Sequence, residues 1–281
     1  MMAHIATAAE ILGTANLRFI EPSFASLTEM RFTEALTELP GDQGRLLIDE
    51  EETPVALALG DGETWIAGTF HLRKPSINVL DRFEETLGEI YQEDRATWAA
   101  SVREYFSREI LSTVAPAIED MNSSRPGMVE GLVRRVWGDL PGGVCLDCGC
   151  GSGVGSHVLR RLRYSPLSYD NDASLLSLGL ATGRLAPEET MCIDATRADQ
   201  YVPHAPYGIG LMFGEINQFN QKLWETITRS FLSLTDNALI TVGTEPEVRL
   251  VAGWVGRGCE IFENPADPLY DRWVCLTEKG A

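Results

Sequence analysis

The spacing of apolar residues changes along the 281-residue chain. Apolar positions spaced for an amphipathic helix over 24–39 give way to three short strands between 45 and 72. The separator Gly60-Asp61-Gly62 predicts a hairpin, because Gly and Asp tolerate positive φ. Helical spacing then returns over 77–91 and over 98–114. The first part of the chain is therefore predicted to combine helices with a small sheet.

From residue 144 onward, short apolar runs alternate with helical patterns. The predicted later strands are Leu167–Asp170, Thr190–Ile193, Ile209–Phe213 and Ala238–Val242. This alternation predicts an α/β protein with a doubly wound, mostly parallel, Rossmann-like sheet and an N-terminal α+β extension. A polar break at 122–126 places the expected domains at 1–125 and 126–281. Ligands of such sheets bind beyond the carboxyl ends of the strands.

One glycine-rich stretch carries the strongest chemical signal. An apolar strand runs into Asp147, and glycines alternate at Gly149, Gly151 and Gly153 before a helical pattern begins. Glycines at such a turn let a ligand approach the backbone at a helix N-terminus. None of the three frames completes the dinucleotide fingerprint G-x-G-x-x-G/A. An acid beside the turn would also repel a pyrophosphate.

The run Asp-x-Gly-x-Gly-x-Gly resembles the first motif of class I S-adenosylmethionine-dependent methyltransferases. The resemblance covers about residues 130–281, and it implies S-adenosylmethionine as the cofactor. In that family the glycine turn lies against the methionine part of the cofactor, and the leading acid acts on its amino group, directly or through water. Carried over, these roles fall on Asp147, Gly149, Gly151 and Gly153.

Two later strands also end in an acid. Asp170 follows the first glycine of the motif by 170 − 149 = 21 residues, where a carboxylate accepts hydrogen bonds from a ribose. The resemblance places Asp194 against the adenine amino group, with Ala195 offering its backbone N–H. Asp172 is predicted to cap the following helix rather than to bind a ligand.

The fourth strand leads into Gly214–Gln218, where the family places the transferred methyl. Glu215 and Asn217 are the candidate catalytic residues, because either could orient a nucleophile or accept its proton. Capping of the helix near Gln221 is an equally good interpretation of Asn217. The Asn/Asp-Pro-Pro-aromatic sequence of many nucleic-acid amino methyltransferases is missing here. His204 is a further possible base.

Composition narrows the partners. The chain has 41 acidic and 23 basic residues, a net charge of −18, so a nucleic-acid acceptor is predicted to be unlikely. The start lacks the features of a secretory signal and the chain has no apolar run of membrane length, so a cytoplasmic location is expected. Cys145, Cys148 and Cys150 are interpreted as strand and turn residues, and no metal site is predicted.

These observations favour a methyltransferase that acts on a small molecule or a protein side chain. The alternative is a regulatory protein that binds S-adenosylmethionine without transferring its methyl group. The resemblance does not reach the first 125 residues, whose role in covering the cofactor or shaping an acceptor pocket is an analogy. The identity of the acceptor and the oligomeric state are not encoded in any of these patterns.

Overall fold

The computed structural model describes residues 6–119, 121–138, 142–256 and 258–278. The chain divides into two compact units, Met1–Glu109 and Ile110–Ala281. The division falls inside the helix α4 (Arg95–Thr113) and not at the polar break near residue 125. The domain boundary at that break stays a prediction. No helix in the described part of the chain is both long and apolar enough to cross a membrane.

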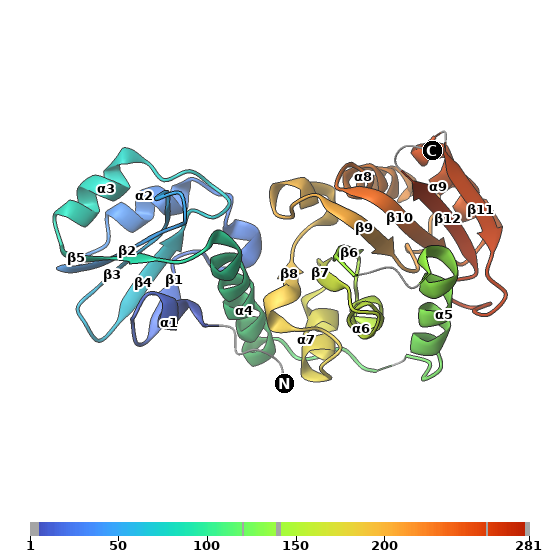
Figure 1. The fold of residues 1–281 in the computed structure, drawn as a ribbon, viewed down its shortest axis with the longest axis horizontal. Coiled ribbons are helices and arrows are strands. Elements are labelled where there is room, and N and C mark those ends of the chain that lie inside the picture. Colours follow the sequence, from blue (N-terminus) through green and yellow to red (C-terminus); the bar gives the residue numbers. More distant parts are fainter. Residues whose placement is uncertain (1–5, 120, 139–141, 257, 279–281) are drawn as a thin grey trace. The chain divides into compact units, whose positions relative to one another are not determined.

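The first unit is a five-stranded mixed sheet with helices (Figure 1). Its strands are β1 (Leu17–Phe19), β2 (Gln43–Ile48), β3 (Pro54–Gly60), β4 (Trp65–Thr69) and β5 (Leu87–Gln92), in the order β1-β4-β3-β2-β5. Its helices are α1 (Ala8–Ile11), η1 (Phe24–Ser26), α2 (Arg31–Thr37), α3 (Ile77–Glu84) and most of α4. The strands β2, β3 and β4 pair in antiparallel fashion, as the predicted hairpin requires.

The helix predicted over 77–91 is wrong in its second half. Helix α3 ends at Glu84, and Leu87–Gln92 forms β5, which pairs in parallel with β2. A Cβ on Gly88 would approach the Phe83 ring to 2.3 Å, so this glycine lets the chain turn back tightly over α3. Helical spacing of the apolar residues did not distinguish an edge strand from a continued helix.

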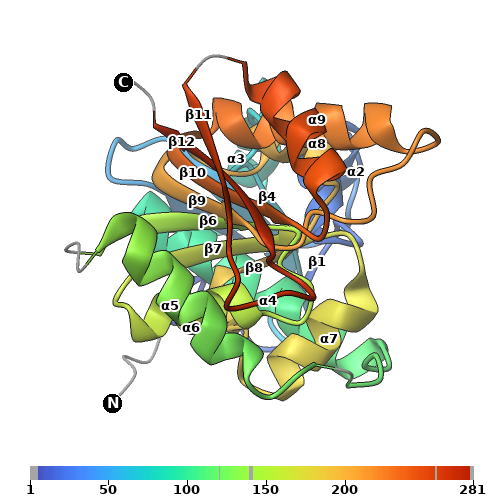
Figure 2. The same ribbon diagram turned by 90° about the vertical axis from the view of Figure 1, so that its right-hand side faces the viewer.

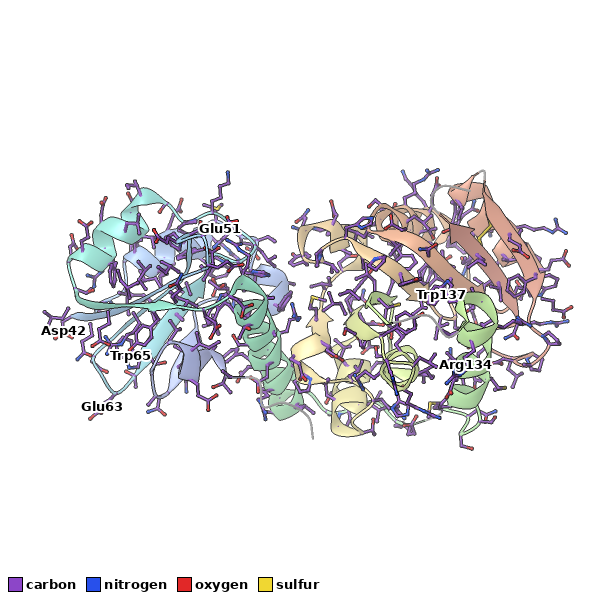
Figure 3. All side chains as sticks on the ribbon, viewed as in Figure 1. Asp42, Glu51, Glu63, Trp65, Arg134 and Trp137 are labelled. Atoms are coloured by element: carbon purple, nitrogen blue, oxygen red, sulfur yellow. A yellow bond between two sulfur atoms is a disulfide. The ribbon has the colours of Figure 1, made fainter. Side chains whose placement is uncertain are left out.

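Two arginines of this unit, one buried and one partly buried, make close contacts with acidic, carbonyl or aromatic groups. Arg73 forms a buried ion pair with Glu21 and also donates to the Leu27 carbonyl at 2.8 Å. The guanidinium of Arg45 lies 4.9 Å from the Trp65 ring, which Figure 3 labels at the start of β4. A buried charge is tolerated when such partners replace water.

The second unit contains a seven-stranded sheet. Its strands are β6 (Val144–Cys148), β7 (Ser165–Asp170), β8 (Thr190–Cys192), β9 (Ala205–Gly210), β10 (Thr235–Val242), β11 (Cys259–Glu263) and β12 (Trp273–Glu278). Its helices are α5 (Arg125–Trp137), α6 (Val154–Arg161), α7 (Ala173–Ala181), η2 (Pro187–Glu189), η3 (Ala195–Gln200), α8 (Gln221–Ser233) and α9 (Glu245–Val255). Asp172 caps α7 by accepting from the Ser174 and Leu175 N–H groups, as predicted.

The strand order of this sheet is β11-β12-β10-β9-β6-β7-β8. The five strands from β8 to β10 are parallel, and β12 lies antiparallel between β10 and β11. Figure 2 shows α5 and α6 on one face of the sheet and α8 and α9 on the other. The predicted doubly wound fold is confirmed. Its topological switch point lies between β6 and β9, where ligands of such sheets bind.

The core of this unit fixes α5 against the sheet. Trp137, labelled in Figure 3, lies 5.0 Å from the Tyr207 ring and 6.0 Å from the Tyr164 ring. Cys145, Cys148 and Cys150 are free and buried, whereas Cys259 and Cys275 form a disulfide between β11 and β12.

Candidate functional site

The glycine turn follows β6 at the switch point of the sheet. Gly149, Gly151 and Gly153 have φ of +66°, +51° and +84°, in the left-handed region that favours glycine. A Cβ on Gly149 would meet no described atom within 4 Å, and one on Gly151 would meet the nearest at 3.9 Å. A Cβ on Gly153 would clash with Leu185 at 2.6 Å. The first two glycines therefore leave room above the backbone, and the third allows close packing.

The N–H groups of these glycines donate within the chain. Gly149 donates to the Tyr169 carbonyl at 2.9 Å, Gly153 to the Cys150 carbonyl at 2.8 Å, and Gly151 to Oδ2 of Asp170 at 2.9 Å. A pyrophosphate site at a helix N-terminus needs such N–H groups directed at the ligand. This turn therefore offers clearance for a ligand rather than a cradle of free donors.

Asp170 ends β7, the strand next to β6. Its Oδ1 accepts from the Asp172 N–H at 2.9 Å, so both carboxylate oxygens hold backbone groups. Burial raises the pKa of this carboxyl above its usual range. Each oxygen of a carboxylate can accept more than one hydrogen bond, so Asp170 retains capacity for a ligand hydroxyl.

Asp147 lies inside the sheet, beneath the turn. Its side chain is 1% exposed, and its Oδ2 accepts from the Ser156 hydroxyl at 2.5 Å. Ser156 also lies 2.5 Å from the Ser168 hydroxyl oxygen. Burial raises the pKa of Asp147 to about 6. These contacts give Asp147 a supporting position under the glycines, and its predicted action on a cofactor amino group stays a prediction.

Asp194 and Ala195 follow β8, the next strand in the sheet. Asp194 is exposed and caps η3 by accepting from the Thr196 N–H at 2.9 Å. The Ile193 N–H donates to the Asp170 carbonyl at 3.0 Å, which joins the two strand ends. The structure thus brings the glycine turn, Asp170 and Asp194 to successive strand ends on one edge of the sheet.

Arg184 is a neighbour of the turn that the sequence did not single out. Its Nε donates to the Ser152 carbonyl at 2.9 Å, and its Nη1 lies 2.6 Å from Oε2 of Glu119. It therefore ties the glycine turn to the segment that precedes α5. An arginine in a loop after a helix gives no sequence signal for this contact.

The segment after β9 carries Glu215 and Asn217. The Ile216 N–H donates to Oε1 of buried Glu247 at 2.8 Å. Asn217 accepts from the Phe219 N–H at 2.9 Å, so its side chain helps to shape the turn before α8. Glu215 is exposed, and its carboxylate has no hydrogen bond or ion pair within the described residues. Of the two candidates, Glu215 has the side chain that is available for chemistry.

His204 lies at the amino ends of the parallel strands, opposite the end that carries the glycine turn. It directly precedes β9 and its Nε2 is 3.4 Å from Oδ1 of Asp236, near the start of β10. The glycine turn and Glu215 follow the carboxyl ends of β6 and β9 instead. The structure therefore does not place His204 with the other candidates. Across the described ranges no group of three His, Cys, Asp or Glu side chains could hold a metal ion.

Comparisons with known proteins find similarity at the level of the three-dimensional fold. No protein-family model and no curated protein matches the sequence. A magnesium protoporphyrin IX methyltransferase from Synechocystis PCC 6803 with bound S-adenosylmethionine is 17% identical, with 64% of this chain and 96% of that chain covered and a TM-score of 0.42. TehB from Haemophilus influenzae is 17% identical, with 63% and 67% covered and a TM-score of 0.39. A 16S rRNA methyltransferase from T. thermophilus, in complex with AdoMet and guanosine, is 16% identical, with 58% and 44% covered and a TM-score of 0.42.

The doubly wound, mostly parallel fold, which the resemblance to class I methyltransferases implied, is confirmed by the strand order of the sheet. The prediction that a nucleic-acid acceptor is unlikely is wrong, since an rRNA methyltransferase is among the similar structures. The net charge of −18 sums the whole surface, whereas phosphate contacts depend on bases gathered at one place. Net charge therefore does not exclude RNA as an acceptor.

Proposed function

We propose that this chain, with its class I methyltransferase fold, transfers a methyl group from S-adenosylmethionine to an acceptor. The observation that carries the proposal is the open glycine turn beside Asp170. Two of its left-handed glycines, Gly149 and Gly151, leave space for a ligand, while the N–H groups of the turn are already engaged and two acids lie close by. That arrangement suits a cationic nucleoside and not a pyrophosphate.

In this proposal the residues at each of the three strand ends contact a different part of the cofactor. Gly149 and Gly151 give the methionine part close access to the backbone, and Asp147 with Ser156 supports the turn from below. Asp170 accepts from the ribose hydroxyls. Asp194 and the Ala195 N–H receive the adenine edge, as the resemblance implies.

The bound cofactor supplies a methyl group on a sulfonium, which makes the reaction an in-line displacement. The protein then has to position the acceptor and exclude water from the reacting atoms. Glu215 lies after β9, across the switch point from the glycine turn, and its free carboxylate accepts a proton or orients the nucleophile. Asn217 contributes by holding the shape of the segment that carries Glu215.

The acceptor classes proposed from the sequence are a small molecule and a protein side chain. RNA joins them, because the charge argument against it has failed. The alternative is a regulatory protein that binds the cofactor and transfers nothing. It predicts that no acceptor of any class is methylated.

Calorimetry with S-adenosylmethionine and S-adenosylhomocysteine tests donor binding. We expect both to bind the folded wild-type chain, and absence of binding by either would refute the proposal. A labelled-methyl assay on host extract, separated into small-molecule, protein and RNA fractions, then identifies the acceptor class. Binding without label in any fraction would favour the regulatory alternative. The Glu215→Gln variant, which keeps the size of the side chain, should bind the cofactor normally and transfer more slowly.

A further inference from the structure

Met212 has an unusual backbone conformation just beyond the carboxyl end of β9. It is the second residue after β9, and its φ is +52°. A left-handed conformation is unfavourable for a residue with a Cβ, and it persists where the surroundings impose it. Met212 stands across the switch point from the glycine turn and leads into the segment that carries Glu215. The groups that impose this conformation therefore also direct that segment.

Thr241, on β10, accepts hydrogen bonds from Met212 and from the residue after it. The Met212 N–H donates to Oγ1 of Thr241 at 2.7 Å, and the Phe213 N–H donates to the Thr241 carbonyl at 2.8 Å. Thr241 is completely buried, so its own side of these bonds is shielded from water, whereas Met212 is exposed. A threonine hydroxyl has one proton to donate and lone pairs to accept with, and here the lone pair faces Met212.

The proton of that hydroxyl is committed to Asp271. Oγ1 of Thr241 donates to Oδ1 of Asp271 at 2.5 Å, and Asp271 is 1% exposed. Oδ2 of Asp271 accepts from Nε of Arg125 at 3.1 Å, where α5 begins. The Arg125 guanidinium also lies 4.7 Å from the Tyr270 ring. A continuous chain of hydrogen bonds thus runs from Arg125 through Asp271 and Thr241 to the backbone of Met212.

The order of the partners in this series of hydrogen bonds determines which group donates in each bond. An aspartate paired with an arginine only accepts, so the Thr241 hydroxyl has to donate to it and accept from Met212. Asn264 holds Asp271 in place by donating from Nδ2 to its carbonyl at 3.0 Å. Because the members lie on α5, on β10 and between β11 and β12, the position of Met212 depends on three separate elements.

We infer that Arg125, Asp271 and Thr241 are positioning residues for the proposed methyl transfer. They hold Met212 in the left-handed conformation and thereby set the path of the segment from Leu211 to Asn220, which carries Glu215. The inference rests on the proposed function. Its test is therefore designed to separate the conformation of the segment from the activity.

Hydrogen exchange of the free protein tests the conformation without cofactor or acceptor. Thr241→Val keeps the shape of the side chain and removes the hydroxyl, and we expect exchange of peptides within 211–220 to rise about 10-fold. Thr241→Ser restores the hydroxyl and should restore wild-type exchange. Thr235→Val is the matched control, since Thr235 lies at the other end of β10 and its buried hydroxyl donates to the Phe231 carbonyl at 3.2 Å.

Methyl transfer and cofactor binding give the second readout. Thr241→Val should transfer label at least about 10-fold more slowly than wild type, while its Kd for S-adenosylhomocysteine changes by less than about 3-fold. Thr241→Ser and Thr235→Val should transfer normally. If Thr241→Val does not fold, Asp271→Asn takes its place and has to give the same pattern.

Unchanged exchange over 211–220 in folded Thr241→Val would overturn the inference, as would an equal rise in Thr235→Val. Raised exchange with wild-type transfer would also overturn it, because the segment would then be held without consequence for the reaction. If wild-type protein binds no S-adenosylhomocysteine and transfers no label, the proposed function fails and the assigned role in transfer fails with it. The exchange result would still decide whether the chain of hydrogen bonds holds Met212.

Discussion

The backbone N–H of Gly151 donates to Oδ2 of Asp170 at 2.9 Å, joining the glycine turn after β6 to the end of β7. One carboxylate therefore shapes the turn and also stands where a ribose is expected. Asp170→Ala should weaken binding of S-adenosylhomocysteine by about 1.5–3 kcal/mol, through loss of a charged acceptor. Calorimetry measures this change, with the exposed Asp199→Ala as a charge-matched control. An affinity equal to that of the control would remove Asp170 from the site.

The open space over Gly151 leads to a second prediction. Gly151→Ala places a Cβ in that space and strains a backbone at φ +51°, so binding of S-adenosylhomocysteine should fall by at least about 10-fold. Gly131→Ala is the control, because a Cβ there meets no described atom within 4 Å and the residue lies within α5. That variant should bind normally and gain about 0.5–1 kcal/mol of stability. Normal binding by Gly151→Ala would show that no ligand occupies the space.

The sequence predicted the second unit well because its strands and helices follow one another with regular spacing. The strand ends at Asp147, Asp170 and Asp194 were readable because an acid that follows a buried apolar run is conspicuous. The strand β9 was placed late, at Ile209–Phe213, whereas it spans Ala205–Gly210. The apolar run continues past the strand end, and the turn at Met212 depends on Thr241, which is 29 residues away.

Long-range contacts explain what the sequence could not reveal. Nothing around Arg125 in the sequence indicates Asp271, yet the two form an ion pair across 146 residues. Likewise, β5 was mistaken for helix because its apolar residues lie at helical spacing and its pairing partner β2 lies far back in the chain. The engaged N–H groups of the glycine turn were equally invisible, since their acceptors are on β7 and within the turn.

The buried pair of Arg73 and Glu21 makes the first unit sensitive to single changes. Arg73→Met leaves Glu21 buried without its cation, which should cost about 3–5 kcal/mol of unfolding free energy. The double variant Glu21→Gln and Arg73→Met should recover part of that loss, because no uncompensated charge remains. Chemical denaturation of both variants measures the difference. Equal stability of the single and double variants would show that the pair is not coupled.

His71 gives the first unit a dependence on acid. Burial lowers the pKa of His71 to about 4 from its ordinary value of 6.5, so the unfolded chain takes up the proton first as the pH falls. Stability contributed by neutral His71 is complete above pH 6.5 and is lost between there and about pH 4, by about 3 kcal/mol. His71→Leu should flatten this part of the stability curve, measured by thermal unfolding across the range. A curve parallel to wild type would contradict the assignment.

Asp147 produces the opposite slope in the second unit. Burial raises its pKa to about 6 from 3.8, so the folded chain holds the proton more tightly than the unfolded chain. The stability that comes from protonated Asp147 is complete below pH 3.8 and is lost as the pH rises through about 6, again by about 3 kcal/mol. Asp147→Asn keeps an oxygen that can accept from Ser156 and removes the charge. The stability of this variant should therefore no longer fall as the pH rises over this range. Hydrogen exchange within β6 and α6, followed at pH 4, 5 and 6, reports on this unit alone. Because His71 lies in the first unit, these peptides isolate the contribution of Asp147, and their protection factors should fall from pH 4 to pH 6 in wild type and change less in Asp147→Asn. An equal fall in the protection factors of both proteins would contradict the buried, proton-binding position of Asp147 beneath the glycine turn.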